Sequence, residues 1–71
     1  MTNALPKPGD VIVMFDRKRR AVVLNTGIYT HADGMRERCY RIKYLDTKHC
    51  ADVVATEVSH IYQRKQKTET L

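Results

Sequence analysis

The chain has 71 residues, of which 42% are hydrophobic and 30% are charged. This length excludes a second domain, because so short a chain buries only about 60% of its unfolded surface, and the composition excludes a disordered chain. Thirteen Lys and Arg against eight Asp and Glu give a net charge of +5, which favours an anionic partner.

The N-terminal part of the sequence predicts an arm followed by two strands. Residues 1–8 contain both prolines of the chain, so we expect them to lie outside the sheet as an N-terminal arm. The apolar residues 11–15 predict the first strand, and Phe15 is interpreted as a core side chain. A charged connector at residues 16–20 separates this strand from a second one at residues 21–24.

The centre of the sequence predicts a hairpin. Asp33-Gly34 favours a type I′ turn, because both residues tolerate positive φ. In the return strand, residues 39–45, apolar and aromatic side chains alternate with cations, which is typical of a half-buried strand. The predicted inward side chains are Tyr40, Ile42 and Tyr44, and the predicted outward ones are Arg41 and Lys43.

The C-terminal part predicts a fourth strand and one turn of helix. Its elements are, in order, a turn at residues 46–49, a strand at 51–55, a helical turn at 56–59 and the closing core residues Ile61 and Tyr62. The side chain of Thr56 is expected to cap the helical turn. The apolar pattern then ends, so residues 64–71 are predicted to be a flexible basic tail. The folded domain is therefore expected to span residues 9–63.

Short strands with turn residues between them, and no long amphipathic helix, predict an all-β fold. We expect a small antiparallel barrel of about five strands with one short helical turn near the C-terminus, because closure removes the exposed edges of a small sheet.

Four segments carry a resemblance to a known family. They are residues 8–13 with an opening Pro-Gly-Asp, the apolar residues 21–24, the alternating residues 40–46 with their closing aspartate, and residues 53–61. Their order resembles the SH3-like barrel superfamily, and within it the Tudor and KOW modules. The chain departs from the Tudor pattern, since it has no tryptophan and no evident aromatic cage. SH3-like domains of retroviral integrases and of KOW-containing factors bind nucleic acid, and the resemblance implies the same role here.

Cations in the connector and the third strand are the candidate binding residues. Four consecutive cations on a loop can approach phosphates without being buried, and each neutralised phosphate releases counterions. The alternative is a solvated loop that only keeps the protein soluble. Tyr29, in a polar hairpin, is the best exposed candidate for stacking on a base. The full candidate set is Arg17, Lys18, Arg19, Arg20, Tyr29, Arg36, Arg38, Arg41 and Lys43.

Metal binding and catalysis find little support in the residue spacing. The possible ligands His31, Cys39, His49, Cys50 and His60 lack the paired spacing of a structural zinc site. No catalytic motif can be placed in the sequence. We therefore predict that the protein is not an enzyme and uses no metal or cofactor.

The two cysteines and the lack of an apolar N-terminal run predict a reducing, cytoplasmic compartment with free thiols. A Cys39–Cys50 bridge across a hairpin is the alternative. No apolar stretch approaches the roughly 20 residues of a membrane span, so no membrane association is expected.

The first functional hypothesis is a non-catalytic nucleic-acid-binding module. The alternative is a small regulatory adaptor, carried by a phage or another mobile element, that docks on an acidic surface of a host protein through a few anchor side chains. The sequence leaves open whether the ligand is DNA, RNA or protein, and whether the chain self-associates.

Overall fold

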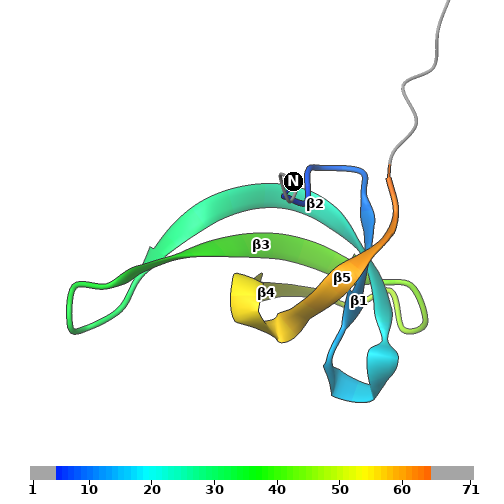
Figure 1. Ribbon diagram of the computed structural model, residues 1–71. Helices are drawn as coiled ribbons and strands as arrows, with labels where there is room; N and C mark the ends of the chain where they lie inside the picture. The colour runs from blue at the N-terminus through cyan, green and yellow to red at the C-terminus, as the bar shows by residue number, and fades with distance from the viewer. Residues whose placement is uncertain (1–4, 65–71) are drawn as a thin grey trace, which may run out of the picture.

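The computed structural model describes residues 5–64, which form five strands and two short 3-10 turns (Figure 1). The strands are β1 (Val11–Met14), β2 (Arg20–Thr30), β3 (Arg36–Tyr44), β4 (Cys50–Val54) and β5 (Val58–Gln63). The turns are η1 (Asp16–Lys18) and η2 (Ala55–Glu57). The prediction of a small all-β fold with about five antiparallel strands is confirmed. Residues 1–4 of the predicted arm and 65–71 of the predicted tail lie outside the described residues.

The five strands form one antiparallel sheet in the order β4-β3-β2-β1-β5. Strands β1, β2 and β3 are each paired with the next strand along the chain, and β5 returns to the other side of β1. The sheet is strongly curled, and η2 alone links its edge strands β4 and β5 (Figure 1). Within residues 5–64 no backbone ladder joins those edges, so the sheet is barrel-like with an open seam.

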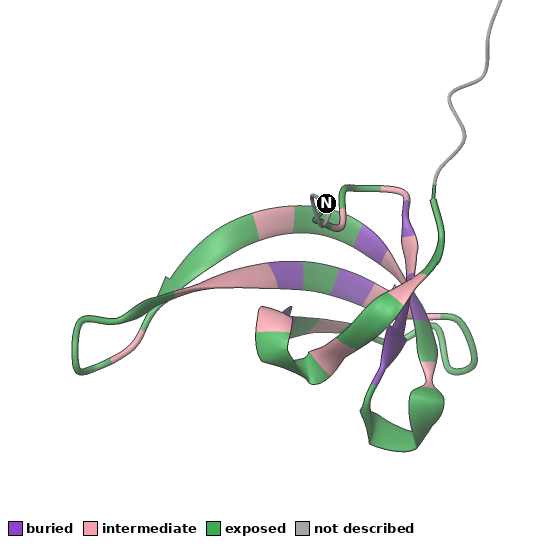
Figure 2. Ribbon diagram, in the orientation of Figure 1, coloured by how far each residue is buried: buried purple, intermediate pink, exposed green. Residues whose placement is uncertain are grey.

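The core lies inside the curl of the sheet. Buried positions gather on β1 and on the halves of β2 and β3 nearest to it (Figure 2). The core side chains are Ile12, Met14, Ala21, Val23, Tyr40, Ile42 and Val53. They recur at every second position along their strands, as a sheet with one buried face requires. The predicted core position of Tyr40 is confirmed, since this residue is only 2% exposed.

Phe15 and Tyr62 correct two predictions. Phe15 is 66% exposed, and Tyr62 is also exposed beside the half-buried Ile61. Ile12 and Met14 face the core, so strand alternation turns residue 15 the other way. Phe15 also leaves the strand, because its dihedral angles (φ −64°, ψ −35°) are helical and lead into η1.

β2 is longer than predicted and runs through a segment that was expected to interrupt it. A bulge between Val23 and Asn25 leaves Leu24 without a partner in β3, and the strand then continues to Thr30. A bulge of this kind bends the strand and increases its twist. Beyond it, β2 pairs with β3 only, so the two strands project from the body as a hairpin arm (residues 25–38), which extends to the left in Figure 1.

The turn of the hairpin arm has the predicted position but another geometry. The Gly34 N–H donates to the His31 carbonyl at 2.9 Å, and the His31 N–H donates to the Met35 carbonyl at 2.7 Å. Gly34 alone has positive φ in this turn, at 92°. This pattern is a type I turn followed by a left-handed glycine, and not the predicted type I′ turn. The Asp33 carboxylate accepts the Met35 N–H at 3.0 Å and holds that conformation.

η2 begins earlier than predicted and is not capped by threonine. The Glu57 carboxylate accepts the Val54 N–H at 3.1 Å, while the Thr56 N–H donates to Glu37 at 3.3 Å. Val58 already belongs to β5. The turn is therefore held by two glutamates, one of its own and one from β3.

A buried carboxylate joins the two ends of the described chain. Asp10 is 3% exposed and accepts the Lys7 N–H at 2.9 Å and an N–H of Arg64 at 3.1 Å. Arg64, which was assigned to the tail, thus lies against the start of β1. An ion pair with one buried partner is sensitive to loss of the other, because the buried charge is then left uncompensated.

Candidate nucleic-acid interface

The tip of the β1–β2 hairpin presents two cations in an unusual backbone conformation. Arg17 (φ 54°, ψ 18°) and Lys18 (φ 52°) both lie in the left-handed region, and both side chains are exposed. The Arg19 N–H donates to the Asp16 carbonyl at 3.1 Å across them. Positive φ at both central positions is the geometry of a type I′ turn, which normally carries asparagine or glycine. Asp16 approaches Arg17 only to 3.9 Å, and an ion pair this exposed contributes little.

Arg19, the third cation of the connector, is bound within the molecule. Its Nη2 lies 3.1 Å from Asp46 Oδ1 and its Nε lies 3.3 Å from Oδ2, so the pair is bidentate. The guanidinium also lies 3.7 Å from the centre of the Tyr44 ring. The hydrogen bond with Asp46 raises the pKa of Arg19, and the hydrogen bond from Arg19 lowers the pKa of Asp46. Arg19 therefore ties the β1–β2 hairpin to the β3–β4 turn.

Arg20 and Lys43 are available on the outer face of the sheet. Arg20 precedes the buried Ala21 and so points outward, where its guanidinium lies 4.7 Å from the Tyr62 ring centre. Lys43 is paired with Val22, which lies two positions after Arg20 on the same face of β2. Neither cation has a carboxylate partner among residues 5–64. With Arg17 and Lys18 they form what we call the outer basic surface.

The four predicted cations of β3 do not share one surface. Arg41 is held by Asp52, its direct neighbour in β4, through contacts of 3.2 Å to both carboxylate oxygens. Arg36 and Arg38 alternate in phase with Tyr40, so they lie on the opposite face of the strand from Arg41 and Lys43. They have no carboxylate partner in the described part of the chain. The basic side that the sequence predicted is therefore divided between two faces of the sheet.

Tyr29 has the exposure that the sequence predicted for a stacking residue. It is 50% exposed and contacts the His31 ring edge-on at 4.8 Å between ring centres. Its partner in β3 is Glu37, whose carboxylate lies 2.9 Å from His31 Nε2. Tyr29 thus lies on the face away from Arg36 and Arg38, so the arm offers a ring on one side and cations on the other.

Lys48 is a cation that the sequence reasoning missed. It lies in the β3–β4 turn, two residues from the Asp46 that Arg19 binds, and it has positive φ (64°) like the cations of the hairpin tip. The turn that carries Lys48 is joined to the β1–β2 hairpin by the Arg19–Asp46 pair, whose residues are 27 positions apart. A contact so distant in the sequence leaves no periodic signal.

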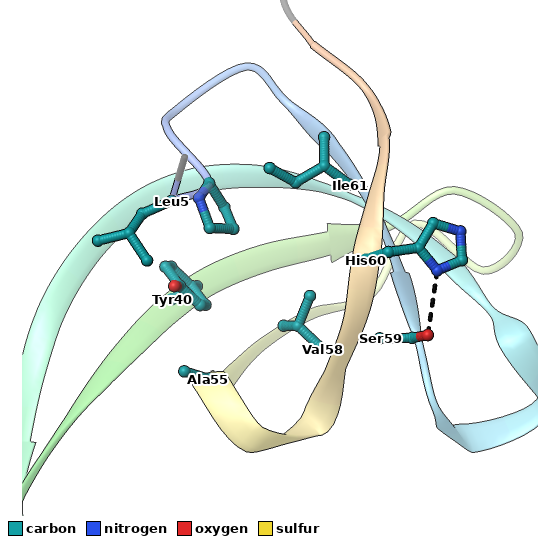
Figure 3. Close-up of a pocket in the computed structure, with 8 residues that line it drawn as sticks. Leu5, Tyr40, Ala55, Val58, Ser59, His60 and Ile61 are labelled. Atoms are coloured by element: carbon teal, nitrogen blue, oxygen red, sulfur yellow. Dashed lines mark hydrogen bonds between the residues drawn. The ribbon is translucent and has the colours of Figure 1, made fainter. Parts of the chain in front are cut away.

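One hollow of the described surface is lined mainly by apolar side chains. It has a volume of about 450 Å³ and lies between the N-terminal segment, β3 and β5 (Figure 3). Its lining comprises Leu5, Pro6, Tyr40, Ala55, Val58, Ser59, His60 and Ile61. Ser59 Oγ and His60 Nδ1 lie 3.0 Å apart, but no acidic side chain of residues 5–64 lines the hollow with them. The hollow therefore offers no acid to orient the histidine as a triad would need.

The cysteines and histidines do not come together as one group in the described part of the chain. No group of three potential metal ligands occurs within residues 5–64. Cys39 is paired with Val54 and Cys50 with Lys43, so the two thiols are four positions apart along the β3–β4 ladder. That offset is about 13 Å, and a disulfide requires α-carbons within about 7 Å. The register excludes the Cys39–Cys50 bridge that the sequence left open, and both cysteines are free.

Acid should weaken the attachment of η2 to the hairpin arm. The pKa of Glu37 lies below its ordinary value, first because of the hydrogen bond with His31 and then because of the one from Thr56. A carboxyl group whose pKa is lowered by folding stabilises the fold at any pH above its pKa in the unfolded chain. This stabilisation is lost as the pH falls through its pKa in the folded protein. The free energy of unfolding should therefore decrease below about pH 4.5, and Glu37→Gln should flatten this decrease.

Urea titrations of both proteins at several pH values between about 3 and 6 measure the effect. Asp46→Asn is a matched control, since it removes another lowered carboxyl pKa without touching η2. A pH dependence that is identical in the wild type and in Glu37→Gln would show that the contacts of Glu37 with His31 and Thr56 do not stabilise the fold.

Comparison with known proteins does not assign the chain to a family. No family model, curated protein or solved structure matches it. Between residues 5 and 64 there is also no helix of the length and apolarity that a membrane crossing needs. The resemblance to SH3-like barrels stays a prediction, and the function has to be inferred from the residues themselves.

Proposed function

We propose that this protein is a small module that binds nucleic acid and catalyses no reaction. In this it would be similar to the SH3-like and KOW modules that it resembles. The observation that carries the proposal is the conformation of Arg17 and Lys18. Both have positive φ at an exposed hairpin tip, where asparagine or glycine would be less strained. Residues that break a local rule are expected at functional sites. We infer that the two cations act through their charge.

The remainder of the outer basic surface supports the same function. Arg20 and Lys43 lie on one face of β2 and β3: Arg20 follows the hairpin tip by two residues, and Lys43 is paired with Val22 of the same strand. Because no described carboxylate holds them, they can bind phosphate without first breaking an internal ion pair. Arg19 and Arg41 lack this freedom, so they are structural members of the predicted set and not phosphate ligands in this proposal.

Binding through these cations should depend steeply on salt. The experiment is a fluorescence-anisotropy titration of labelled duplex DNA, single-stranded DNA and single-stranded RNA at about 0.05 and 0.2 M salt. If all four cations of the outer basic surface contact phosphates of a duplex, the slope of log K against log salt is about −3 to −4. Arg20→Gln combined with Lys43→Gln should reduce its magnitude by about 2.

A matched control uses the Arg41–Asp52 ion pair. Arg41→Gln combined with Asp52→Asn removes one cation and one anion, so the net charge stays at +5. This variant should bind as the wild type does. An equal loss in the control and in the Arg20, Lys43 variant would contradict the assigned surface, and no binding to any of the three polymers at low salt would refute the function.

A protein partner is the second candidate, and two exposed side chains favour it. Phe15 at the β1–β2 turn is 66% exposed and Met35 at the tip of the hairpin arm is 65% exposed. Exposed aromatic and methionine side chains are enriched at protein interfaces. The protein would then act as a small regulatory adaptor on an acidic host protein. Co-purification that survives nuclease and moderate salt, and that is lost in Phe15→Ser, would favour this function over the first.

A further inference from the structure

The hairpin arm has one strand edge without a neighbour. β1 is paired with β2 only as far as Val22, and the last bonds on that side join Val23 to Gly9 and Asp10, each at 2.8 Å. The bulge at Leu24 then reverses the alternation along β2. At the far end the His31 N–H points to Met35, on the β3 side.

It follows that the odd positions of the arm direct their backbone groups to β3 and the even positions direct theirs outward. The even positions are Thr26, Ile28 and Thr30. The Thr26 N–H is taken by the Asn25 side chain at 2.9 Å. Along Ile28 and Thr30, no strand of the described chain pairs with this edge.

Apart from the bulge at its start, the edge lacks the usual protection against pairing. Natural edge strands carry charges, prolines or bulges that block an incoming strand. Residues 25–30 contain neither a charge nor a proline, although 30% of the whole chain is charged. Ile28 is 58% exposed and Tyr29 50% exposed within this segment. Its β-branched and aromatic residues are typical of a paired strand.

We propose that this edge pairs with the same edge of a second copy, antiparallel and about a two-fold axis at Ile28. Each Ile28 N–H then donates to the partner's Ile28 carbonyl. In this register Tyr29 lies opposite the partner's Gly27, and an aromatic ring across from glycine is a favourable cross-strand pair. Thr26 lies opposite the partner's Thr30, which is another favourable pair. One register therefore pairs the Ile28 backbone groups and matches the facing side chains, while the Thr26 N–H keeps its bond to Asn25.

The positive charge of the chain does not prevent this pairing. The arginine nearest to the proposed two-fold axis is Arg38, which is paired with Ile28 in the neighbouring strand β3. The two copies of Arg38 are then three strand spacings apart, about 14 Å, and the screening length at physiological salt is about 8 Å. Added salt should thus strengthen the dimer while it weakens nucleic-acid binding, so the two proposals can fail independently.

Single-cysteine variants test the register. In a background in which Cys39 and Cys50 are replaced by serine, Ile28→Cys places two thiols at the two-fold axis, within the α-carbon distance of a disulfide. Mild oxidation should convert this variant to a covalent dimer on a non-reducing gel. Thr30→Cys in the same background should stay monomeric, because its two copies are offset by four residues, about 13 Å. Equal cross-linking of both variants, or none of either, would overturn the proposal.

Sedimentation equilibrium of the full chain without nucleic acid tests the association itself. The wild type should dimerise reversibly, and Ile28→Lys should raise the dimer dissociation constant at least about tenfold, since it places like charges directly opposite each other. Met35→Lys makes the same change in charge at an exposed position off the edge and should dimerise normally. A wild type that stays monomeric at every salt concentration, or a Met35→Lys variant that loses the dimer equally, would refute the pairing. Circular dichroism confirms that each variant is folded.

Discussion

Replacing Arg17 by asparagine and Lys18 by glycine should make the protein more stable and a weaker ligand of nucleic acid. The two residues hold left-handed dihedral angles at a type I′ turn, and Asn-Gly is the preferred pair for that turn. Left-handed backbone costs an ordinary residue about 1–2 kcal/mol. Relief at the two positions, about 2–4 kcal/mol, is partly offset by about 1 kcal/mol of chain entropy at the new glycine. The double variant should therefore gain about 1–3 kcal/mol in the free energy of unfolding, measured by urea titration.

The same change removes two cations from the outer basic surface. If both contact phosphates, the slope of log K against log salt should decrease in magnitude by about 2 on duplex DNA. The matched control is Arg17→Gln with Lys18→Gln, which removes the charges but keeps the strained backbone, so its binding should fall without a gain in stability. A stabilised Asn-Gly variant with an unchanged salt slope would show that the hairpin tip is not part of the interface.

Replacing Tyr40 by alanine should have the largest effect on the fold. Tyr40 is 2% exposed and lies in the core next to Ile42 and Val53. Truncating a buried aromatic side chain costs about 3–5 kcal/mol, and the core of so small a domain supplies only about 3–5 kcal/mol in total. The variant should therefore be largely unfolded, as seen by circular dichroism and by urea titration of the residual folded fraction.

Tyr29→Ala is the matched control, since Tyr29 is half exposed and projects from the hairpin arm. Its free energy of unfolding should lie within about 1 kcal/mol of the wild-type value. Its effect should appear instead in binding to single strands, where loss of a stacking ring costs about 1–3 kcal/mol per base. Tyr40→Phe, which keeps the ring in the core, should stay folded. Equal destabilisation by Tyr40→Ala and Tyr29→Ala would contradict the assignment of these two rings.

Strands with a simple alternating pattern could be predicted from the sequence. Residues 40–44 alternate between apolar and charged side chains, and the structure places Tyr40 and Ile42 inside as that pattern requires. The turn near Gly34 was located correctly because glycine readily adopts positive φ, although the turn type was wrong. The extent of β2 was missed, since the turn-forming residues Asn25 and Gly27 are held in the strand by their pairing with β3.

The candidate site was harder to predict than the fold. Sequence shows where cations occur, but it does not show which of them are neutralised by a distant carboxylate. Arg19 and Asp46 are 27 positions apart and meet only because two turns lie at one end of the sheet. Arg41 and Asp52 meet through the β3–β4 register. These two pairs removed members from the predicted set, and strand alternation divided the rest between two faces.

By itself, the sequence determined that this chain is a small, basic, all-β domain with its tyrosine-containing third strand half buried. Local periodicity and composition suffice for this, because alternation along a strand is a property of neighbouring residues. Only the tertiary structure decided which cations are free, which face each one occupies and which strand edge is open. These depend on register, and a single bulge at Leu24 is enough to reverse the direction of every backbone group that follows it in β2.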